Sequence, residues 1–438
     1  MNFRLEAYNT ILRVLRGGEF SDTLLNQRAG KLKKEGEDIG LFYAIVKGVI
    51  KKKQKLEYIL SFYTDPEKYQ DTDIKIKVML YLGLYQLIYL DSIPPHAAVH
   101  ETVELAKKQL SPAVGDFVNA VLREYQREDK VVYPEDPAAR IANEHSYPIE
   151  LVKTWLSLWG EEDTEYLAMH FNENPELHIR VNSVATTAKK LQNYFARREI
   201  EIIPCEASEM MFHTTQGAEV LEEVAFSEGY FTVQDTSAAM VVELLDPKAD
   251  QSVLDLFAAP GGKCTYISEI MQNSGEVVAV DKSPKKMKML KQAADRLQLN
   301  NIILVTTDAL KYGPLAPAFD RVLVDAPCSG WGVFSRKADL RWQNHSDIKE
   351  LVKLQAKALD YAANFVKPGG YMVYSTCTMN PEENEHQIKA FLSRNSKFSL
   401  EPAEKYIPKQ YTEDGFLKTI PFKHFMDGAF AAKLMKSI

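Results

Sequence analysis

Several features that mark whole classes of protein are absent from this sequence of 438 residues. No apolar run approaches the ~18 residues that a membrane-spanning helix needs, so no membrane association is expected. The chain begins with a polar, helix-like stretch, so no signal peptide is expected either. The cysteines include no Cys-x-x-Cys pair, which argues against a disulfide framework and against a zinc ribbon. We therefore expect a cytoplasmic protein without a metal. The cysteines are Cys205, Cys264, Cys328 and Cys377.

The chain also lacks the net positive charge that is common among nucleic-acid-binding proteins. Its formal charge is −7, but the acidity lies in the middle of the chain. The net charge is +2 over residues 1–130, −14 over residues 131–250 and +5 over residues 251–438. Local basic faces, such as Lys51 to Lys53 with Lys55, are compatible with these values. Charge therefore neither supports nor excludes an RNA partner.

The first two parts of the chain differ in their apolar patterns. Residues 1–130 show only helical spacing and predict an all-α domain, with helices at 39–62, 74–90, 96–109 and 112–127. Residues 131–250 predict a proline-marked linker around 134–148, followed by a small α+β subdomain. Its helices are expected at 148–159, 187–198 and 235–245, and its strands at 178–182 and 230–233.

Residues 251–438 alternate regularly between strands and helices. Short apolar runs, typical of buried parallel strands, occur at 253–257, 277–280, 302–305, 322–324 and 371–374. Helices are predicted between them at 264–272, 284–297, 347–365 and 381–392. This order predicts an α/β domain with a doubly wound, mostly parallel sheet. A last strand at 429–434 is expected at the edge of that sheet.

A glycine turn follows the first of these strands, where residues 257–263 read Phe-Ala-Ala-Pro-Gly-Gly-Lys. Glycine allows a ligand to approach the backbone, and the N-terminus of the following helix offers free N–H groups. The pattern is neither a Gly-x-Gly-x-x-Gly fingerprint nor a Walker A loop. Asp281 and Asp308 end the next two strands, where acids contact a ribose and an adenine. Each acid alone is equally well explained as a strand-end cap, but together with the turn they predict a ligand that contains adenosine.

Two of the cysteines stand at the ends of two further predicted strands. Cys328 lies in an Asp-Ala-Pro-Cys-Ser-Gly segment that begins at Asp325, and Cys377 lies in a Tyr-Ser-Thr-Cys-Thr segment. The carboxyl ends of parallel strands line the crevice where ligands bind. Two thiols delivered there indicate covalent chemistry on the bound molecule. For the other two cysteines, burial in the core is the simpler interpretation.

With these motifs in this order, residues 252–438 resemble the S-adenosylmethionine-dependent RNA cytosine-5 methyltransferases of the Sun/Fmu/NOL1/NOP2 family. Residues 336–342, the Glu-Glu-Asn-Glu run at 382–385, and Asp427 with Gly428 also match. The all-α domain is similar to the fold of the antitermination factor NusB, through residues 95–99 and 117–123. This domain order is similar to that of the bacterial small-subunit rRNA methyltransferases of the family.

The resemblance implies a Rossmann-like class I methyltransferase domain that binds S-adenosylmethionine and modifies RNA, most closely small-subunit (16S) rRNA. It assigns the attack on cytosine to Cys377 and resolution of the adduct to Cys328. Asp325 would hydrogen-bond N3 and the exocyclic amine if burial raised its pKa. A monomer is compatible with the sequence. The cofactor-binding residues implied are Phe257, Ala258, Ala259, Pro260, Gly261, Gly262, Lys263, Asp281, Asp308 and Asp325.

Some individual roles stay open. Lys263 either caps an acidic partner, contacts the ligand or is solvated. Arg341 and Trp342, with Arg336 and Lys337, place phosphates and a stacked base, or form a solvated loop around a core tryptophan. A further pair, Arg180 and Asn182, resembles an RNA-contacting segment of the family, although a plain strand explains it equally well.

Other functions compete with the leading one. A tRNA cytosine-5 methyltransferase would use the same motifs, and a non-catalytic rRNA-binding assembly factor would share the fold. An amino-group methyltransferase is disfavoured, because that chemistry favours Asn/Asp-Pro-Pro-aromatic where this chain has Asp325 followed by Ala-Pro-Cys. The intact glycine turn and both cysteines argue against a protein that has lost activity.

Overall fold

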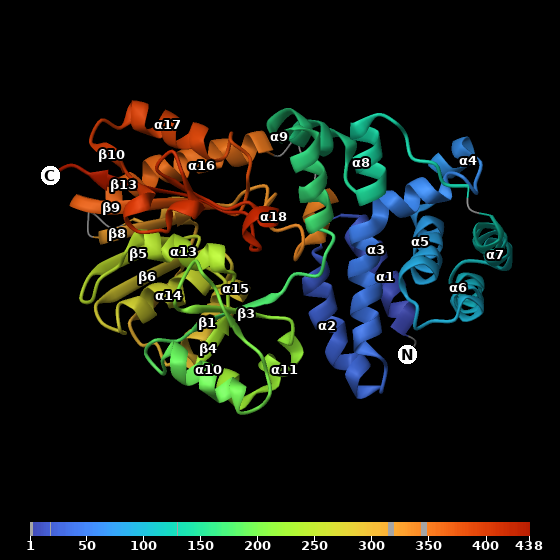
Figure 1. Ribbon diagram of the computed structural model, residues 1–438, viewed down its shortest axis with the longest axis horizontal. Coiled ribbons are helices and arrows are strands. Elements are labelled where there is room, and N and C mark those ends of the chain that lie inside the picture. Colours follow the sequence, from blue (N-terminus) through green and yellow to red (C-terminus); the bar gives the residue numbers. More distant parts are fainter. Residues whose placement is uncertain (1–2, 18, 129, 314–318, 343–347) are drawn as a thin grey trace. The chain divides into compact units, whose positions relative to one another are not determined.

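The computed structural model describes residues 3–17, 19–128, 130–313, 319–342 and 348–438. Contacts group the chain into two units, whose segments can be followed by the colours along the sequence in Figure 1. The first is Met1–Glu173 with Phe334–Gln343, and the second is Asn174–Val333 with Asn344–Ile438. The boundaries expected near residues 130 and 250 stay a prediction. None of the helices in the described ranges combines the length and apolar composition of a membrane span.

The first unit is helical, as the spacing of its apolar residues predicts. Helix α5 (Ile74–Tyr89) is buried from Val78 to Gln86, which suits the centre of a helical bundle. Helix α3 (Ile39–Leu60) contacts α1, α2, α5 and α8 and supplies much of the remaining core. The other helices are α1 (Phe3–Leu15), α2 (Ser21–Lys34), α4 (Pro66–Gln70), α6 (Pro95–Gln109), α7 (Pro112–Arg127), α8 (Pro137–His145) and α9 (Ile149–His170).

The predicted linker around residues 134–148 is wrong, because it contains helix α8. Pro137 stands at the start of that helix, where its missing N–H costs nothing. The Asp136 carboxylate accepts a hydrogen bond from Ala139 N at 2.8 Å and caps the same end. Helix α9 also extends well beyond the predicted 148–159, and Gly160 interrupts it with a φ of +78°.

A short segment from far along the chain completes the core of the helical unit. Within the 3₁₀ helix η2 (Ala338–Trp342), the Arg341 side chain is fully buried. Its guanidinium donates to Phe171 O at 2.8 Å and to Asn172 Oδ1 at 3.0 Å. Trp342 Nε1 donates to Ile50 O at 2.8 Å. The expectation that Arg341 and Trp342 place phosphates and a stacked base is therefore wrong, since both are used inside the unit.

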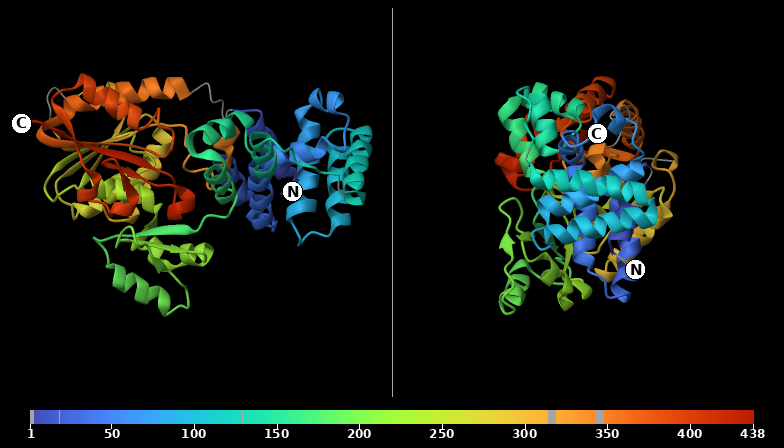
Figure 2. Two further views of the ribbon diagram at one scale, coloured as in Figure 1. Left: turned by 45° about the horizontal axis from the view of Figure 1, so that its top comes forward. Right: turned by 90° about the vertical axis from the view of Figure 1, so that its right-hand side faces the viewer.

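The second unit contains the predicted doubly wound sheet. Its strand order is β11-β12-β13-β9-β8-β5-β6-β7, and the pairs among β9, β8, β5, β6 and β7 are parallel. Alternate residues of β5 face opposite sides, with Val253 packing among α13, α14 and α15, and Leu254 packing with α16 and α17. Figures 1 and 2 show these helix sets on the two faces of the sheet.

These elements have the following bounds. The strands are β5 (Ser252–Leu256), β6 (Glu276–Asp281), β7 (Ile302–Thr306), β8 (Phe319–Asp325), β9 (Val366–Thr376), β10 (Phe398–Glu401), β11 (Thr412–Glu413), β12 (Phe416–Lys418) and β13 (Phe430–Lys436). The helices are α13 (Thr236–Leu245), α14 (Gly262–Ile270), α15 (Pro284–Arg296), α16 (Ile348–Ala362) and α17 (Glu385–Arg394). The predicted start of α16 at residue 347 lies outside the described residues.

The last strand was expected at the edge of the sheet, but it lies inside the sheet, between β12 and β9. Strand β13 pairs antiparallel with β9, and it also pairs with β10 and β12. Ala431, Ala432 and Leu434 are fully buried as a result. The covering strands have only three or four residues, which is too short for a clear alternating pattern in the sequence.

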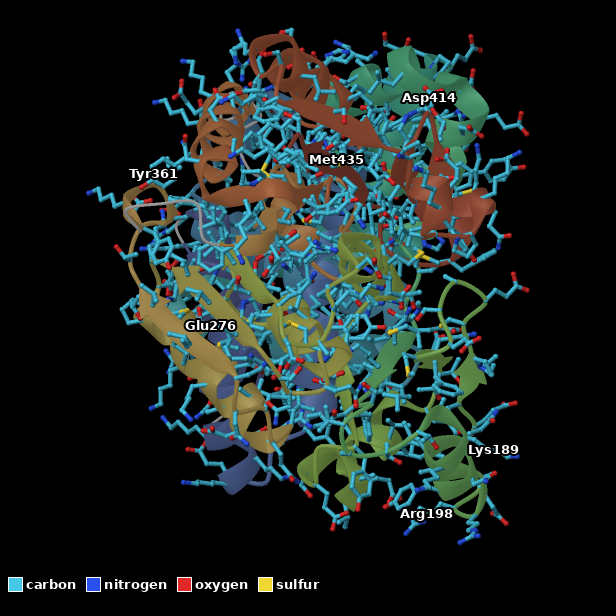
Figure 3. All side chains as sticks on the ribbon, turned by 90° about the vertical axis from the view of Figure 1, so that its left-hand side faces the viewer. Lys189, Arg198, Glu276, Tyr361, Asp414 and Met435 are labelled. Carbon is cyan, nitrogen blue, oxygen red and sulfur yellow. The ribbon has the colours of Figure 1, made fainter. Side chains whose placement is uncertain are left out.

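A small antiparallel sheet precedes the large one in the same unit. Its order is β2-β3-β1-β4, with β1 (Leu177–Val181) between β3 (Met211–Thr214) and β4 (Phe231–Val233). Helix α10 (Ala188–Ala196) buries Leu191 and Phe195. Lys189 on this helix and Arg198 just beyond its end are exposed and are labelled in Figure 3. The remaining elements are β2 (Ile203–Pro204), α11 (Gly217–Glu222) and α12 (Val224–Ser227).

Candidate active site

The glycine turn joins β5 to α14 at the carboxyl edge of the parallel strands. Phe257 and Gly261 have φ values of +65° and +111°. Ala258 N donates to Val280 O at 3.0 Å, which ties the turn to the end of β6. A Cβ atom on Gly261 would lie 2.6 Å from Leu290 Cγ of α15. Position 261 therefore requires glycine for its conformation and for the close approach of α15.

The surroundings of the turn fit an adenosine-containing cofactor. Gln234 lies beside Gly262, and in the described part of the chain its buried Nε2 atom has no hydrogen-bond partner. Asp281 is the last residue of β6, and Asp308 stands two residues beyond β7. Since β5, β6 and β7 are parallel neighbours, the turn and both acids share one edge of the sheet.

The two acids also act as local caps, which was the alternative explanation for them. Asp281 Oδ1 accepts from Ser283 N at 2.8 Å, and Asp308 Oδ1 accepts from Leu310 N at 3.0 Å. Each of these hydrogen bonds uses one carboxylate oxygen. The capping bonds hold the two carboxylates in fixed orientations at the ends of their strands.

A buried arginine of the small sheet hydrogen-bonds to the glycine turn and to the start of α14. Arg180, on β1, donates to Gly262 O at 2.9 Å and to Thr265 Oγ1 at 3.1 Å, and forms an ion pair with Glu269 at 2.6 Å. Asn182 Nδ2 donates to the carbonyl oxygens of Gly229 and Leu297. Both side chains are almost entirely buried, so the expectation that they contact RNA is wrong.

An ion pair lies where β8 ends. Asp325 Oδ2 is 2.9 Å from Lys263 Nζ, and its Oδ1 accepts from Ser375 Oγ at 2.8 Å. Lys263 thus caps an acidic partner, which was one of its three predicted roles. Burial opposes the charge on Lys263, but attraction to Asp325, with a contribution from Cys377, outweighs it and raises the lysine pKa. The ammonium group therefore stays charged in the site.

A second acid lies buried below this ion pair. Asp255 of β5 is 1% exposed, and within the described chain neither of its oxygens has a hydrogen-bond partner. Burial, reinforced by the charge of Asp325, raises the pKa of Asp255 well above its usual range. The protonated carboxyl adds no negative charge to the site. Sequence analysis did not identify Asp255 as a site residue. The only indication in the sequence was an acidic residue within an apolar strand.

The two predicted thiols are in direct contact. Cys328 Sγ lies 3.3 Å from Cys377 Sγ, although 49 residues separate them in the chain. The hydrogen bond to Cys377 and burial raise the pKa of the Cys328 thiol well above its usual range. The prediction that β8 and β9 bring both cysteines to one place is confirmed.

Two glycines hold the loops of these cysteines together. Gly332 N donates to Cys377 O at 3.0 Å, and Gly428 N donates to Gly332 O at 2.8 Å. A Cβ atom on Gly332 would lie 2.0 Å from Gly428 O, so no side chain fits at that position. This close approach gives a physical reason for the glycine that follows Asp427.

Sequence reasoning assigned no role to three buried polar residues behind the thiols. Glu383 and Asn384 belong to the Glu-Glu-Asn-Glu run, and Gln355 lies on α16. All three hydrogen-bond to the loops that carry the cysteines. Gln355 could have been found in the sequence as a polar residue at a core position of the predicted helix. Ala358, Leu359 and Ala362 lie on the same buried face.

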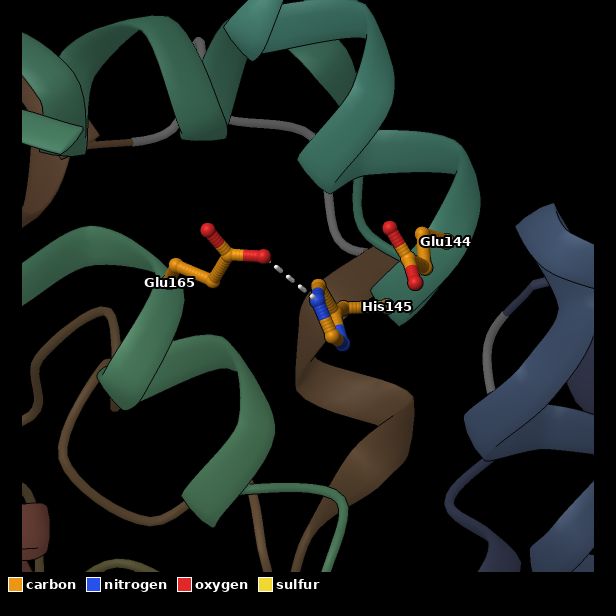
Figure 4. Close-up of side chains that lie close together, drawn as sticks. All are labelled: Glu144, His145 and Glu165. Atoms are coloured by element: carbon orange, nitrogen blue, oxygen red, sulfur yellow. Dashed lines mark ion pairs between the residues drawn. The ribbon is translucent and has the colours of Figure 1, made fainter. Parts of the chain in front are cut away.

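A cluster of potential metal ligands lies in the helical unit (Figure 4). Single ligand atoms of Glu144, His145 and Glu165 lie within 4.8 Å of one another. Arg140 already binds this cluster, at 2.5 Å from Glu165 and 3.6 Å from Glu144. An arginine within the cluster supplies the positive charge that a cation would bring, so the group is a surface ion-pair network.

Comparison with known proteins agrees with this geometry. Residues 242–435 match the family model "16S rRNA methyltransferase RsmB/F", and residues 1–127 match the "NusB family". The chain is 36% identical over 440 residues to "Probable ribosomal RNA small subunit methyltransferase B" of Bacillus subtilis, covering 98% of each chain.

Two solved structures share the fold. The structure titled "Crystal Structure of PH0851" covers 99% of this chain and 98% of its own, with a TM-score of 0.83 and 24% identity. The structure of NSun6 from Pyrococcus horikoshii with SFG covers 67% of this chain and 99% of its own, with a TM-score of 0.58 and 22% identity. The relative that aligns over the whole length, together with both family models, confirms the resemblance stated from the motifs. The chain belongs to the ribosomal RNA small subunit methyltransferase B family.

Proposed function

We propose that this chain methylates carbon 5 of a cytosine in 16S rRNA, with S-adenosylmethionine as the methyl donor and through a covalent bond to the base. The observation that carries the proposal is the pair of thiols 3.3 Å apart beside the ion pair of Asp325 and Lys263. A methyltransferase that acts on nitrogen or on a ribose hydroxyl has no use for two contacting thiols at the ends of neighbouring strands. The names of the relatives support small-subunit rRNA as the substrate. Such a substrate also places the enzyme in the cytoplasm, where ribosomal RNA is modified.

The turn and the acids at the strand ends would hold the cofactor. Backbone groups of residues 257–263 would line its path, Asp281 would accept from the ribose hydroxyls, and Asp308 would contact the adenine. Asp325 ends β8 at the same edge of the sheet. When bound, S-adenosylmethionine supplies an electrophilic methyl group.

Cys377 would attack the base, because carbon 5 of cytosine is a poor nucleophile until a thiolate adds to carbon 6. The new S–C6 bond uses a thiolate electron pair, and the C5–C6 double-bond pair becomes available at carbon 5. The raised pKa of Cys328 keeps a proton on that sulfur, so its S–H can donate to the Cys377 thiolate.

Asp325 would orient the base by accepting hydrogen bonds from the exocyclic amine, and from N3 once N3 carries a proton. Lys263 and Ser375 each bond one of its oxygens and fix the plane of the carboxyl group. After methylation, the proton on carbon 5 leaves, its C–H pair re-forms the double bond, and Cys377 departs with the S–C6 pair. Cys328 lies 3.3 Å from that departing sulfur and would relay the proton: its S–H proton goes to the departing Cys377 sulfur, and the C5 proton takes its place on Cys328.

The test is to trap the covalent complex with purified variants and an rRNA substrate. Cys377→Ala should form no protein–RNA adduct and no methylated product. Cys328→Ala should attack and transfer the methyl group, then accumulate an adduct that survives denaturing electrophoresis and disappears with nuclease. Cys205→Ala, a half-buried thiol of the small sheet, is the matched control and should behave as the wild type.

Two outcomes would contradict the proposal. If Cys377→Ala traps RNA and Cys328→Ala does not, the two thiols have the opposite roles. If neither variant traps RNA and both stay active, no covalent step occurs. Bisulfite sequencing of the product identifies the methylated position as cytosine C5.

A further inference from the structure

The residues that flank each reactive cysteine hydrogen-bond to one of two adjacent side chains, directly or, for Pro327, through Gln355. Pro327 and Ser329 stand on either side of Cys328, and Thr376 and Thr378 stand on either side of Cys377. The adjacent side chains are Glu383 and Asn384, which are 0% and 3% exposed. They lie between the end of β9 and the start of α17, and they hydrogen-bond to the loops that carry the two cysteines.

Glu383 holds the loop of Cys328. Ser329 donates to its carboxylate twice, from the backbone N at 2.9 Å and from Oγ at 2.5 Å. Gln355 Nε2 donates to Glu383 at 2.9 Å and to Pro327 O at 2.9 Å, which extends the same support to the other side of the cysteine. Asn380 Nδ2 adds a bond at 3.2 Å. These four donors to a buried carboxylate are all uncharged, so geometry and not charge pairing defines their arrangement.

Asn384 holds the loop of Cys377 in the same way. Thr376 Oγ1 donates to Asn384 Oδ1 at 2.6 Å, and Asn384 Nδ2 donates to Thr378 O at 2.9 Å. One amide therefore bonds to the residues on both sides of the nucleophile. The two supports meet where Ser329 Oγ and Thr378 Oγ1 lie 2.8 Å apart.

We propose that Glu383 and Asn384 are positioning residues with separate tasks. Glu383, with Gln355, sets where Cys328 stands for product release, and Asn384 sets where Cys377 stands for attack. The kinetic part of this inference rests on the proposed covalent mechanism. The part that concerns thiol geometry does not depend on it.

The first measurement uses neither RNA nor cofactor. Dibromobimane links two thiols that lie within a few ångströms of each other and becomes fluorescent. Glu383→Gln places an N–H group against the donors from Ser329 and Gln355, and Asn384→Asp places an oxygen against Thr378 O. We expect about tenfold to a hundredfold slower cross-linking of Cys328 to Cys377 in both variants, because small displacements change proximity rates by that order. Glu382→Gln is the matched control, since this neighbouring glutamate is exposed, and it should cross-link at the wild-type rate.

The second measurement separates the two tasks. Glu383→Gln should still attack and methylate, and then accumulate the protein–RNA adduct as Cys328→Ala does. Asn384→Asp should lose adduct formation and kcat together. Gln355→Leu removes the hydrogen bonds to Pro327 O and to Glu383, so it tests the Glu383 support without changing a buried charge. It should shift in the same direction as Glu383→Gln.

Wild-type cross-linking rates in Glu383→Gln and Gln355→Leu would overturn the positioning role of Glu383. Identical adduct behaviour in Glu383→Gln and Asn384→Asp would overturn the separation of tasks. If neither Cys328→Ala nor Cys377→Ala forms an adduct and both still methylate RNA, the covalent mechanism fails. The cross-linking rates then still decide whether the two side chains set the positions of the thiols.

Discussion

The two glycines of the cofactor turn carry different physical constraints. Gly261 has a φ of +111° and leaves no room for a Cβ atom, which would lie 2.6 Å from Leu290. At Gly262 the nearest atom to such a Cβ is Gln234 Nε2, at an ordinary contact distance of 3.6 Å. The first glycine is thus required by the fold, while the second leaves space beside the backbone where a ligand can approach.

We predict that substitution of Gly261 lowers stability, whereas substitution of Gly262 blocks cofactor binding. Gly261→Ala should lower the free energy of unfolding by about 1–2 kcal/mol from its conformation alone, with more from the clash. Gly262→Val should keep the melting temperature within a few degrees and abolish detectable S-adenosylmethionine binding. Thermal denaturation and titration calorimetry measure the two effects. The exposed Gly30, which has no atom within 4 Å of its Cβ position, provides a neutral Gly→Val control for the calorimetry. Unchanged cofactor affinity in Gly262→Val would contradict the placement of the ligand.

The candidate site was predictable wherever a residue stands directly after a strand. Asp281, Asp325 and Cys377 each follow or end a short apolar run, and parallel strands bring such positions together. The role of Arg180 stayed open between an RNA contact and a plain strand, because its partner Glu269 is 89 residues away. Local sequence does not show whether a basic side chain points to solvent or to a buried acid.

At the scale of elements, strand β1 and helix α14 are joined by a buried ion pair. Arg180 and Glu269 both have side chains that are 0% exposed. Removal of one partner of such a pair leaves the other charge buried and unpaired, which costs more than the pair itself contributes. The same arginine supports the carbonyl of Gly262, so its loss affects both stability and the cofactor turn.

Arg180→Met should therefore lower the free energy of unfolding by about 3–5 kcal/mol at neutral pH, as measured by urea denaturation. Burial raises the pKa of Glu269, and Arg180 opposes that rise. Without Arg180 the folded state binds the Glu269 proton still more tightly than the unfolded chain does. The loss of stability should then be smallest below the unfolded pKa of ~4.3 and grow as the pH rises above it.

Two comparisons decide whether the ion pair is the cause. Arg180→Met with Glu269→Met should recover part of the loss, because no unpaired charge remains. Arg198→Met, at an exposed pair with Glu223, should change stability by less than about 1 kcal/mol. A pH-independent loss in Arg180→Met would show that packing and not charge is responsible.

Prolines explain where element prediction failed. In this chain proline begins several helices, and Pro137 was misinterpreted as part of a linker although Asp136 before it is a good helix cap. The long periodic helices α3 and α5 were placed within two residues of their observed ends. Strands such as β2 and β11 have two residues each, and their pairing depends on partners that local sequence does not reveal.

At the scale of the whole molecule, the helical unit is discontinuous in sequence. Ala338, Arg341 and Trp342 belong to its core, although they lie more than 160 residues beyond the end of α9. Arg341 satisfies carbonyl groups of the unit from inside, including Phe171 O. A fragment that stops at Glu173 therefore lacks part of its own interior.

We predict that a fragment of residues 1–173 is stabilised by a synthetic peptide of residues 334–342 added in trans. Since the peptide binds the folded fragment, its melting temperature should rise with peptide concentration. A peptide with Arg341→Ala should give little or no rise, because the carbonyl groups stay unsatisfied. Circular dichroism at 222 nm follows the transition. Equal melting temperatures with and without the wild-type peptide would contradict the assignment of this segment to the helical core.

The discontinuity of the helical unit has a topological consequence. The chain passes between the two units three times, after Glu173, after Val333 and after Gln343. A single cut after Glu173 leaves two polypeptides, and the inserted segment of the longer one still packs in the core of the shorter. Non-covalent contacts of this segment therefore oppose separation of the two pieces after one proteolytic event. A recombination breakpoint at that position would transfer the catalytic domain together with a segment that fits another protein's helices.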